Sequence, residues 1–332
     1  VIVISTKSGK PGKLIINYNG FVGVRYLPKT LDVMNPYDYV VYQSERSRGN
    51  ETDSLNFTKD FGTTWDTLQN YKNQSPVNWQ KEVLGNTGLS TTHSISGSGG
   101  TQKMTYNFGY TYNADKAIVT NSKYYRNILS FKTDYKFTKS LKAGLGIRYT
   151  NQNVYGAGVS DTKGSSYSRL RNAVKYRPFL SAGQNLYSVD SLAYDQVGNG
   201  LSLKNPILLA NAEYRNKITN TYNLNGNISY NIKKNFIFKS TWGYEYKNFV
   251  DLQFSDSITP YAIIQGSSMP IAGLDTTITS TFTNSNVLTY AIKNFKDKHD
   301  FDFLLGEETY DLKSERYSSL YGKYPLNISP EE

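Results

Sequence analysis

Metal coordination is the first chemistry that the aspartates and histidines of this chain suggest. Asp251, Asp256 and Asp275 flank one loop, and carboxylate oxygens are the ligands that calcium takes from proteins. Their spacing is not that of an EF-hand, so solvated loop carboxylates are the favoured interpretation. His93 and His299 are the only histidines and lie far apart in the sequence, which favours surface positions over a shared metal. The sequence therefore predicts no metal site and no cofactor.

The residue patterns of catalytic sites are also missing from the sequence. The run Gly97-Ser98-Gly99-Gly100 has the glycines of a phosphate loop, but neither GxxxxGK[ST] nor a GxGxxG that opens a helix is present. A turn is the favoured interpretation of this run. The chain has no cysteine, which excludes disulfides and thiol catalysis. No Ser/His/Asp order and no paired carboxylates can be argued, so we expect a protein that is not an enzyme.

Aromatic side chains in two long non-strand segments are the candidates for ligand binding. Flat rings there could stack on sugar rings or on peptide side chains. The alternative is that each ring packs into the small core of its own loop, and this alternative is favoured for any single residue. The candidates are Trp65, Tyr71, Trp79, Tyr155, Tyr167, Tyr187 and Tyr194.

Composition and charge narrow the class of protein. The 332 residues include 29 tyrosines, and tyrosine suits both β-structure and a membrane interface, because its ring has an oily body and a polar tip. No apolar run approaches the roughly 18 residues of a membrane helix, which excludes helical spans only. The net charge is +10, but the lysines and arginines are scattered along the sequence, so nucleic acid is not an expected partner.

Residues 103–153 show the clearest secondary-structure pattern, three consecutive strands with strict alternation. In the first, Met104, Phe108 and Tyr112 share one parity, while Thr and Asn residues hold the other. Side chains on a strand alternate between faces, so each strand has one oily and one polar face. The same pattern recurs at 14–26, 222–232, 236–246 and 278–292, and weakly at 89–97, with a last strand expected at 299–312. This alternation suits a wall with lipid on one side and water on the other.

The connections between these strands alternate in length. Tight turns are expected at 99–102, 138–140, 233–235 and 293–298, and wider connections at 27–88, 115–123, 152–218 and 254–277. Short helices are expected after Asn35-Pro36, at 78–84, at 165–176 and after Asn205-Pro206, since Asn caps a helix and Pro suits its first position. In an up-and-down sheet this order puts all tight turns at one end, as in outer-membrane barrels.

About nine strands can be counted, so that either the count is off by one or the chain is part of a larger barrel, which is the favoured interpretation. Bacterial single-chain barrels have an even number of strands, and an open edge in lipid would leave backbone groups without partners. The sequence therefore predicts an all-β, antiparallel, up-and-down transmembrane β-barrel segment that is incomplete, with helices in long extracellular loops. Rings near strand ends are expected to form aromatic girdles at both interfaces: Tyr110, Tyr112, Tyr149, Tyr230, Phe236, Tyr244 and Tyr290.

Several short motifs, in this order, resemble the SusC/RagA family of TonB-dependent outer-membrane transporters. Residues 1–10 (VIVISTKSGK) resemble the end of the plug domain of that family, and 14–26 its first barrel strand. LDVMN at 31–35, WQKEV at 79–83, SISGSGG at 94–100 and NPI at 205–207 continue in family order. No single motif is decisive, but their order is specific and covers essentially the whole chain.

The resemblance implies an organisation and a set of partners. Residues 1–13 would be the C-terminal end of the plug, and residues 14–332 the N-terminal part of a barrel of about 22 strands. The function implied is energised uptake of oligosaccharides or peptides at the cell outer membrane, with a SusD-type surface lipoprotein as lid. TonB would act through a segment absent from this chain. Outer-membrane lipid and the oligosaccharide or peptide ligand complete the expected partners.

Two other classes of protein remain open from the residues alone. One is a small outer-membrane adhesin or structural barrel that binds without transport, which the sequences on either side of the chain would distinguish. The other is a soluble β-sandwich enzyme, which would stay in the aqueous phase without detergent.

Overall fold

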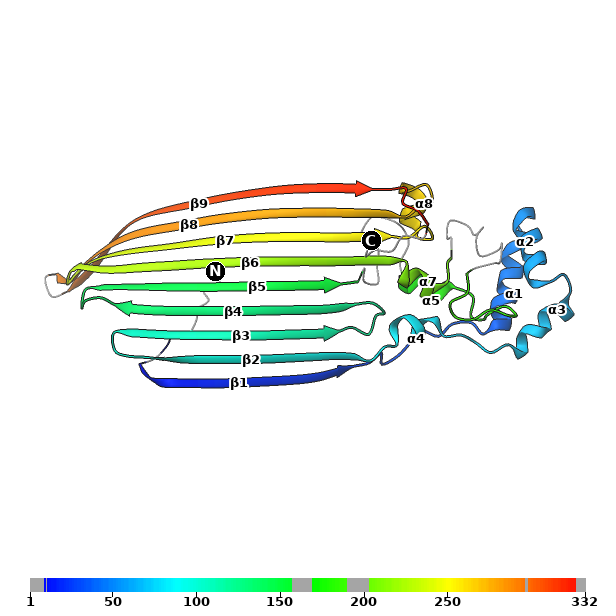
Figure 1. Cartoon of the computed structure of the whole chain (residues 1–332), viewed down its shortest axis with the longest axis horizontal. Helices are drawn as coiled ribbons and strands as arrows, with labels where there is room; N and C mark the ends of the chain where they lie inside the picture. Colours follow the sequence, from blue (N-terminus) through cyan, green and yellow to red (C-terminus); the bar gives the residue numbers. More distant parts are fainter. Residues whose placement is uncertain (1–8, 10, 157–168, 190–202, 296–297, 327–332) are drawn as a thin grey trace.

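The backbone forms one open sheet of nine strands, as the sequence predicted. The computed structural model describes residues 9, 11–156, 169–189, 203–295 and 298–326. Each strand pairs antiparallel with the next, so that the order in the sheet is the order in the chain. Figure 1 shows the strands side by side along the long axis of the molecule. The strands are β1 (Gly12–Arg25), β2 (Gly88–Gly100), β3 (Met104–Lys116), β4 (Lys123–Lys136), β5 (Leu141–Tyr155), β6 (Glu213–Lys233), β7 (Phe236–Ser255), β8 (Ile271–Phe295) and β9 (His299–Tyr321).

The pairing register aligns the oily residues of neighbouring strands in rows across the sheet. Phe108 pairs with Phe131, which pairs with Ile147, and the row continues through Leu224 to Tyr244. The next row towards the ends of β3 and β5 is rich in tyrosine, and we call it the tyrosine row. Because side chains alternate, all members of a row lie on one face of the sheet. The tyrosine row consists of Tyr18, Ile95, Tyr110, Leu129, Tyr149, Tyr222 and Tyr246.

Neither face of the sheet is packed into a hydrophobic core. On the oily face, Phe108 is 37% exposed and Tyr110 41% exposed, although both are large apolar or aromatic side chains. The buried hydrophobic residues belong almost entirely to the segments outside the strands. A soluble sandwich would bury this face against a second sheet. The exposed oily face instead requires an apolar surrounding.

The oily face changes position along β8 and β9, and this explains the weak alternation at Asn284 and Asn286. Leu288 and Tyr290 pair with Leu305 and Phe303 near the tight turn between the two strands. Further along, the same face is mainly polar: Asn286 pairs with Glu307 and Asn284 with Thr309, while Phe282 pairs with Asp311. Strands of a barrel are tilted against its axis, so an apolar belt crosses successive strands at different rows. We therefore attribute the polar stretch to strand tilt.

The strands of the second half are longer than the sequence predicted. β6 has 21 residues, β7 20, β8 25 and β9 23, whereas the alternating runs covered only part of each strand, mostly the part next to the tight turns. The wide connections are correspondingly shorter: that between β7 and β8 spans 256–270, and that between β3 and β4 spans only 117–122. The remaining parts of these strands carry oily residues without a regular parity, as at Phe249, Val250 and Leu252 of β7, so hydrophobic alternation does not mark them.

The helices of the described residues lie beyond one end of the sheet, at the right in Figure 1, and the tight turns lie at the other end. This sorting confirms the predicted alternation of connections. Two helices begin as expected: the side chain of Asn35 accepts a hydrogen bond from the Asp38 N–H, and Asn205 caps the helix that begins at Pro206. The helices are α1 (Pro36–Ser47), α2 (Glu51–Phe61), α3 (Trp65–Gln69), α4 (Trp79–Leu84), α5 (Arg169–Lys175), α7 (Pro206–Asn211) and α8 (Pro260–Gln265), with a 3₁₀ turn, η1 (Asn70–Asn73).

Two small cores hold the helical end together. In the first, Tyr39 and Val40 of α1 meet Phe57 and Phe61 of α2, together with Phe179. In the second, Trp79 and Val83 of α4 pack against Ala173 of α5 and Ile207 and Ala210 of α7. Each core joins segments far apart in the sequence. Within the described part of the chain, no helix combines the length and apolar character needed to cross a membrane.

Candidate functional site

Trp79 and Tyr71, two of the predicted ligand-binding aromatics, lie inside the helical cores. Trp79 is 2% exposed, and its indole N–H donates a hydrogen bond of 2.7 Å to the Arg177 carbonyl. Tyr71 packs on Phe61 and Phe179, and burial raises the pKa of its hydroxyl, with the Arg177 charge acting in the opposite direction. Both rings therefore have a structural role, which is the alternative that the sequence favoured for single residues.

Trp65 and Tyr187 are the predicted aromatics that the structure leaves accessible. Trp65 is 60% exposed at the start of α3, and Tyr187 is 65% exposed. The Trp65 ring stands edge-on to Tyr37 at 6.2 Å between centroids, and the Lys72 ammonium lies 4.7 Å from the Tyr37 centroid. Trp65, Tyr37 and Lys72 thus form an exposed patch of two rings and one cation at the helical end.

The remaining three predicted residues have different surroundings. Tyr155 is partly buried at the end of β5, where it stands edge-on to Tyr125 at 6.1 Å. Tyr167 and Tyr194 lie outside the described residues. The five predicted residues that the structure describes therefore do not converge on one cleft: Trp65 and Tyr187 are accessible at the helical end, and Tyr155 is on the strand wall.

The residues that suggested a metal are occupied by other contacts. Asp251 is 4% exposed and accepts two hydrogen bonds from the guanidinium of Arg215, one of them 2.9 Å long from Nε. Asp275 forms an ion pair with Arg316, and His93 lies 2.7 Å from the Tyr18 hydroxyl. No group of three or more potential metal ligands occurs among residues that the structure describes. The glycine run at 97–100 belongs to the end of β2, with the turn following it.

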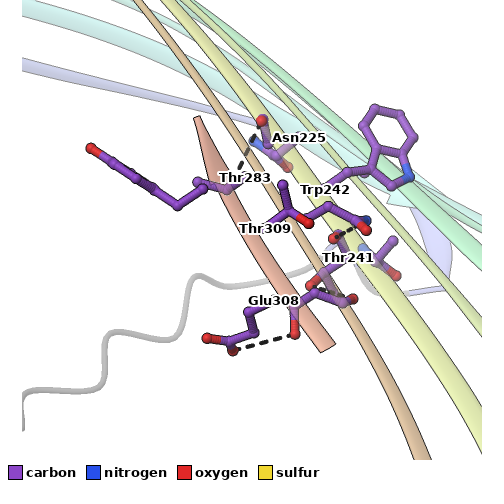
Figure 2. A pocket seen from close by; sticks show the side chains of 12 residues that line it. Asn225, Thr241, Trp242, Thr283, Glu308 and Thr309 are labelled. Carbon is purple, nitrogen blue, oxygen red and sulfur yellow. Dashed lines mark hydrogen bonds between the residues drawn. The ribbon is translucent and has the colours of Figure 1, made fainter. Parts of the chain in front are cut away.

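A hollow on the polar face of the sheet was not predicted from the sequence. Figure 2 shows it at the middle of β6–β9, and its volume is about 510 Å³. Asn225 of β6, Thr241 of β7, Thr283 of β8 and Glu308 of β9 contribute polar atoms. Ser285 donates a hydrogen bond of 3.4 Å to Glu308. On the oily face behind the hollow, Trp242 lies over Gly226, where any Cβ would collide with its ring.

This hollow can form hydrogen bonds but has no catalytic arrangement. Its amides and hydroxyls donate and accept, and Glu308 supplies one carboxylate. The lining residues come from four strands and from non-adjacent positions, so a sequence motif could not reveal them. The one sequence pattern that could have indicated these lining residues is the run of small polar residues that alternate with the oily residues along each strand.

Comparison with known proteins identifies the class of protein. No family model matches the chain. A TonB-dependent receptor named P3 from Formosa agariphila is 24% identical over 261 residues, which cover 75% of this chain and 22% of that receptor. SusC, a TonB-dependent receptor from Bacteroides thetaiotaomicron, is 26% identical over 248 residues, covering 71% of this chain and 23% of SusC.

The fold agrees with these sequence matches. Solved structures of the RagAB peptide importer in its closed-closed state and of the RagAB peptide transporter superpose with a TM-score of 0.69, at 15% and 17% identity. They match 98% of this chain and 38% of the solved chains. The chain is thus similar in sequence to TonB-dependent receptors and shares the fold of the RagAB structures. More particularly, the resemblance to the SusC/RagA family is confirmed, and the chain spans about a quarter of the length of the curated relatives it matches.

Proposed function

We propose that this chain is part of the barrel wall of a TonB-dependent nutrient transporter in the cell outer membrane. One observation supports this proposal above the others: the oily face of the nine-stranded sheet is exposed along its whole width, while the helical end has cores of its own. Lipid is the surrounding that such a face requires. The tyrosine row would then be one aromatic girdle, and Tyr230, Phe236 and Tyr290 part of the other.

The proposed orientation puts the helical end outside the cell and the tight turns in the periplasm, as in other outer-membrane barrels. Residues 1–13 would be the end of the plug, although β1 already begins at Gly12. A SusD-type lipoprotein would cover the helical end, and TonB would act through a segment outside this chain. Oligosaccharides or peptides are the proposed cargo; the solved neighbours carry the name of a peptide importer.

Non-enzymatic uptake is preferred to the adhesin alternative because the curated relatives are receptors of the TonB-dependent kind. The accessible rings Trp65 and Tyr187 would contact cargo at the mouth, and the hollow beside Glu308 would face the lumen.

Leu145→Arg is expected to destabilise the receptor that contains this chain by about 2–4 kcal/mol, because Leu145 lies on the oily face near mid-membrane. Folding stability in lipid bilayers is the measurement. Thr150→Arg, on the polar face of the same strand, is the matched control and is expected to cost much less. Equal stability of the Leu145 variant and wild type would mean that the two faces are reversed.

The orientation can be tested with single cysteines, since the chain has none of its own. Asn73→Cys at the helical end is expected to react with a membrane-impermeant maleimide on intact cells. Ser140→Cys at a tight turn is expected to react only after the outer membrane is permeabilised.

Uptake of labelled oligosaccharides and peptides by cells with and without TonB separates transport from adhesion. We expect uptake only where TonB is present. Uptake that does not depend on TonB, or binding without uptake, would contradict the proposal.

A further inference from the structure

The tight-turn end of the sheet carries most of the net positive charge of the chain. This end comprises residues 11–16, 101–106, 133–144, 229–240, 291–295 and 298–302. It holds ten lysines, no arginine and three aspartates, an excess of seven positive charges where the whole chain has +10. These lysines are scattered along the linear sequence. The four hairpins bring them to one rim because every second connection lies at the same end.

The lysines of this basic rim are exposed and largely without acidic neighbours. Lys103, Lys139, Lys234 and Lys298 lie in the turns themselves, all on the surface. Among the described residues of the rim, the ion pairs are those of Lys293 with Asp300 and Asp302. At the helical end, by contrast, arginines pair with carboxylates, as in Arg25–Asp115 and Arg169–Glu213.

Two features describe the charge of this rim and its place beside the oily face. Lys136 and Lys142, on the polar face of the sheet, are directly opposed across β4 and β5, and like charges in this position destabilise a sheet. The rim also borders the last oily rows without a gap: Phe137 is 57% exposed next to Lys136, and Ile232 precedes Lys233. Lysine stems lie along apolar surface while their ammonium groups reach the polar layer beyond it.

We propose that the basic rim binds the anionic phospholipid headgroups of the leaflet on the periplasmic side. This inference rests on the proposed function, because it requires that the oily face lie in lipid. Lys103, Lys139 and Lys234 lie in the turns directly beyond the oily rows, so the first charged groups that they meet would be headgroup phosphates. Lysine ammonium groups near a negatively charged lipid surface are attracted to it, and salt screens the attraction.

Lipid selectivity of the intact receptor tests the proposal. The receptor is reconstituted in phosphatidylcholine vesicles, and electron paramagnetic resonance measures its preference for spin-labelled phosphatidylglycerol over spin-labelled phosphatidylcholine. The variant K103Q/K139Q/K234Q removes one lysine from each of three turns. We expect its preference to fall by at least about five-fold, the effect of one lysine near an anionic surface. High salt should lower the preference of the wild type in the same way.

The control is K29Q/K59Q/K81Q, which removes the same charge from exposed positions at the helical end. It should keep the wild-type preference. A wild type without lipid preference, or a control variant that loses as much as the rim variant, would overturn the proposal. A wild-type receptor that does not enter vesicles at all would instead contradict the proposed function, so the two failures are distinguishable.

Discussion

Trp79→Ala is expected to open the helical end, at a cost of about 3–5 kcal/mol, the loss typical of a buried aromatic truncated to alanine. The ring joins three segments that are distant in sequence, since Trp79 of α4 packs edge-on against Tyr176, 5.1 Å between centroids, and shares a core with Ile207 of α7. Its removal also leaves the Arg177 carbonyl without the indole donor. Hydrogen exchange of α4, α5 and α7 measures the free energy of this local opening.

Trp65→Ala is the matched control, and it also tests ligand binding. This ring is 60% exposed and touches Tyr37 by its edge, so its loss should change stability by less than about 0.5 kcal/mol. If the Trp65 ring stacks on cargo, the affinity of the Trp65→Ala receptor for oligosaccharide or peptide cargo should be several-fold lower than that of the wild type, equivalent to about 1 kcal/mol. Unchanged affinity in Trp65→Ala and Tyr187→Ala would remove these rings from the proposed site. Unchanged exchange in Trp79→Ala would contradict the structural role of that residue.

Asp251→Asn is expected to destabilise the receptor by about 3–5 kcal/mol. Asp251 is buried and pairs through both oxygens with Arg215, and Gln253 donates a further hydrogen bond of 3.1 Å. The amide keeps the shape but removes the charge, so the guanidinium, which is mostly buried, loses its counter-ion. Thermal unfolding in bilayers or detergent is the measurement.

The double variant R215M/D251L separates the charge effect from packing. Replacing both partners by apolar groups leaves no unpaired charge, so the double variant should lose much less stability than Asp251→Asn alone.

Calcium or a chelator should not change the stability of the wild type, since the Asp251 carboxylate is already paired with the Arg215 guanidinium. A loss of stability on chelation would restore Asp251 as a metal ligand.

The sequence predicted the strand number and the sorting of turns because both depend on local patterns. Alternation at Met104–Tyr112 and the Asn35-Pro36 cap are signals within a few residues, and local geometry decides them. α2 was missed although Asn50 and the acidic residues of its first turn are start signals of the same kind. The full length of β6–β9 was not predicted because their remaining parts mix oily and polar residues without a regular parity.

The site was less predictable because burial depends on packing between distant segments. Trp65 and Trp79 look alike in sequence, yet one is accessible and the other lies under α5 and α7. The hollow at Asn225 and Glu308 exists only when four strands are in register. The basic rim likewise exists only in three dimensions, since its lysines come from four hairpins and the start of β1.

The polar stretch on the oily side of β8 and β9 has a consequence for the mouth of the barrel. A strand needs only about 9–11 residues to cross a bilayer, and these two have 25 and 23. Under the proposed function, the part of β8 and β9 beyond the apolar belt would stand in water on both sides, as a collar above the membrane. The proposed lipoprotein lid would then rest on this raised sector on one side and on the helices on the other, so its seat would be asymmetric.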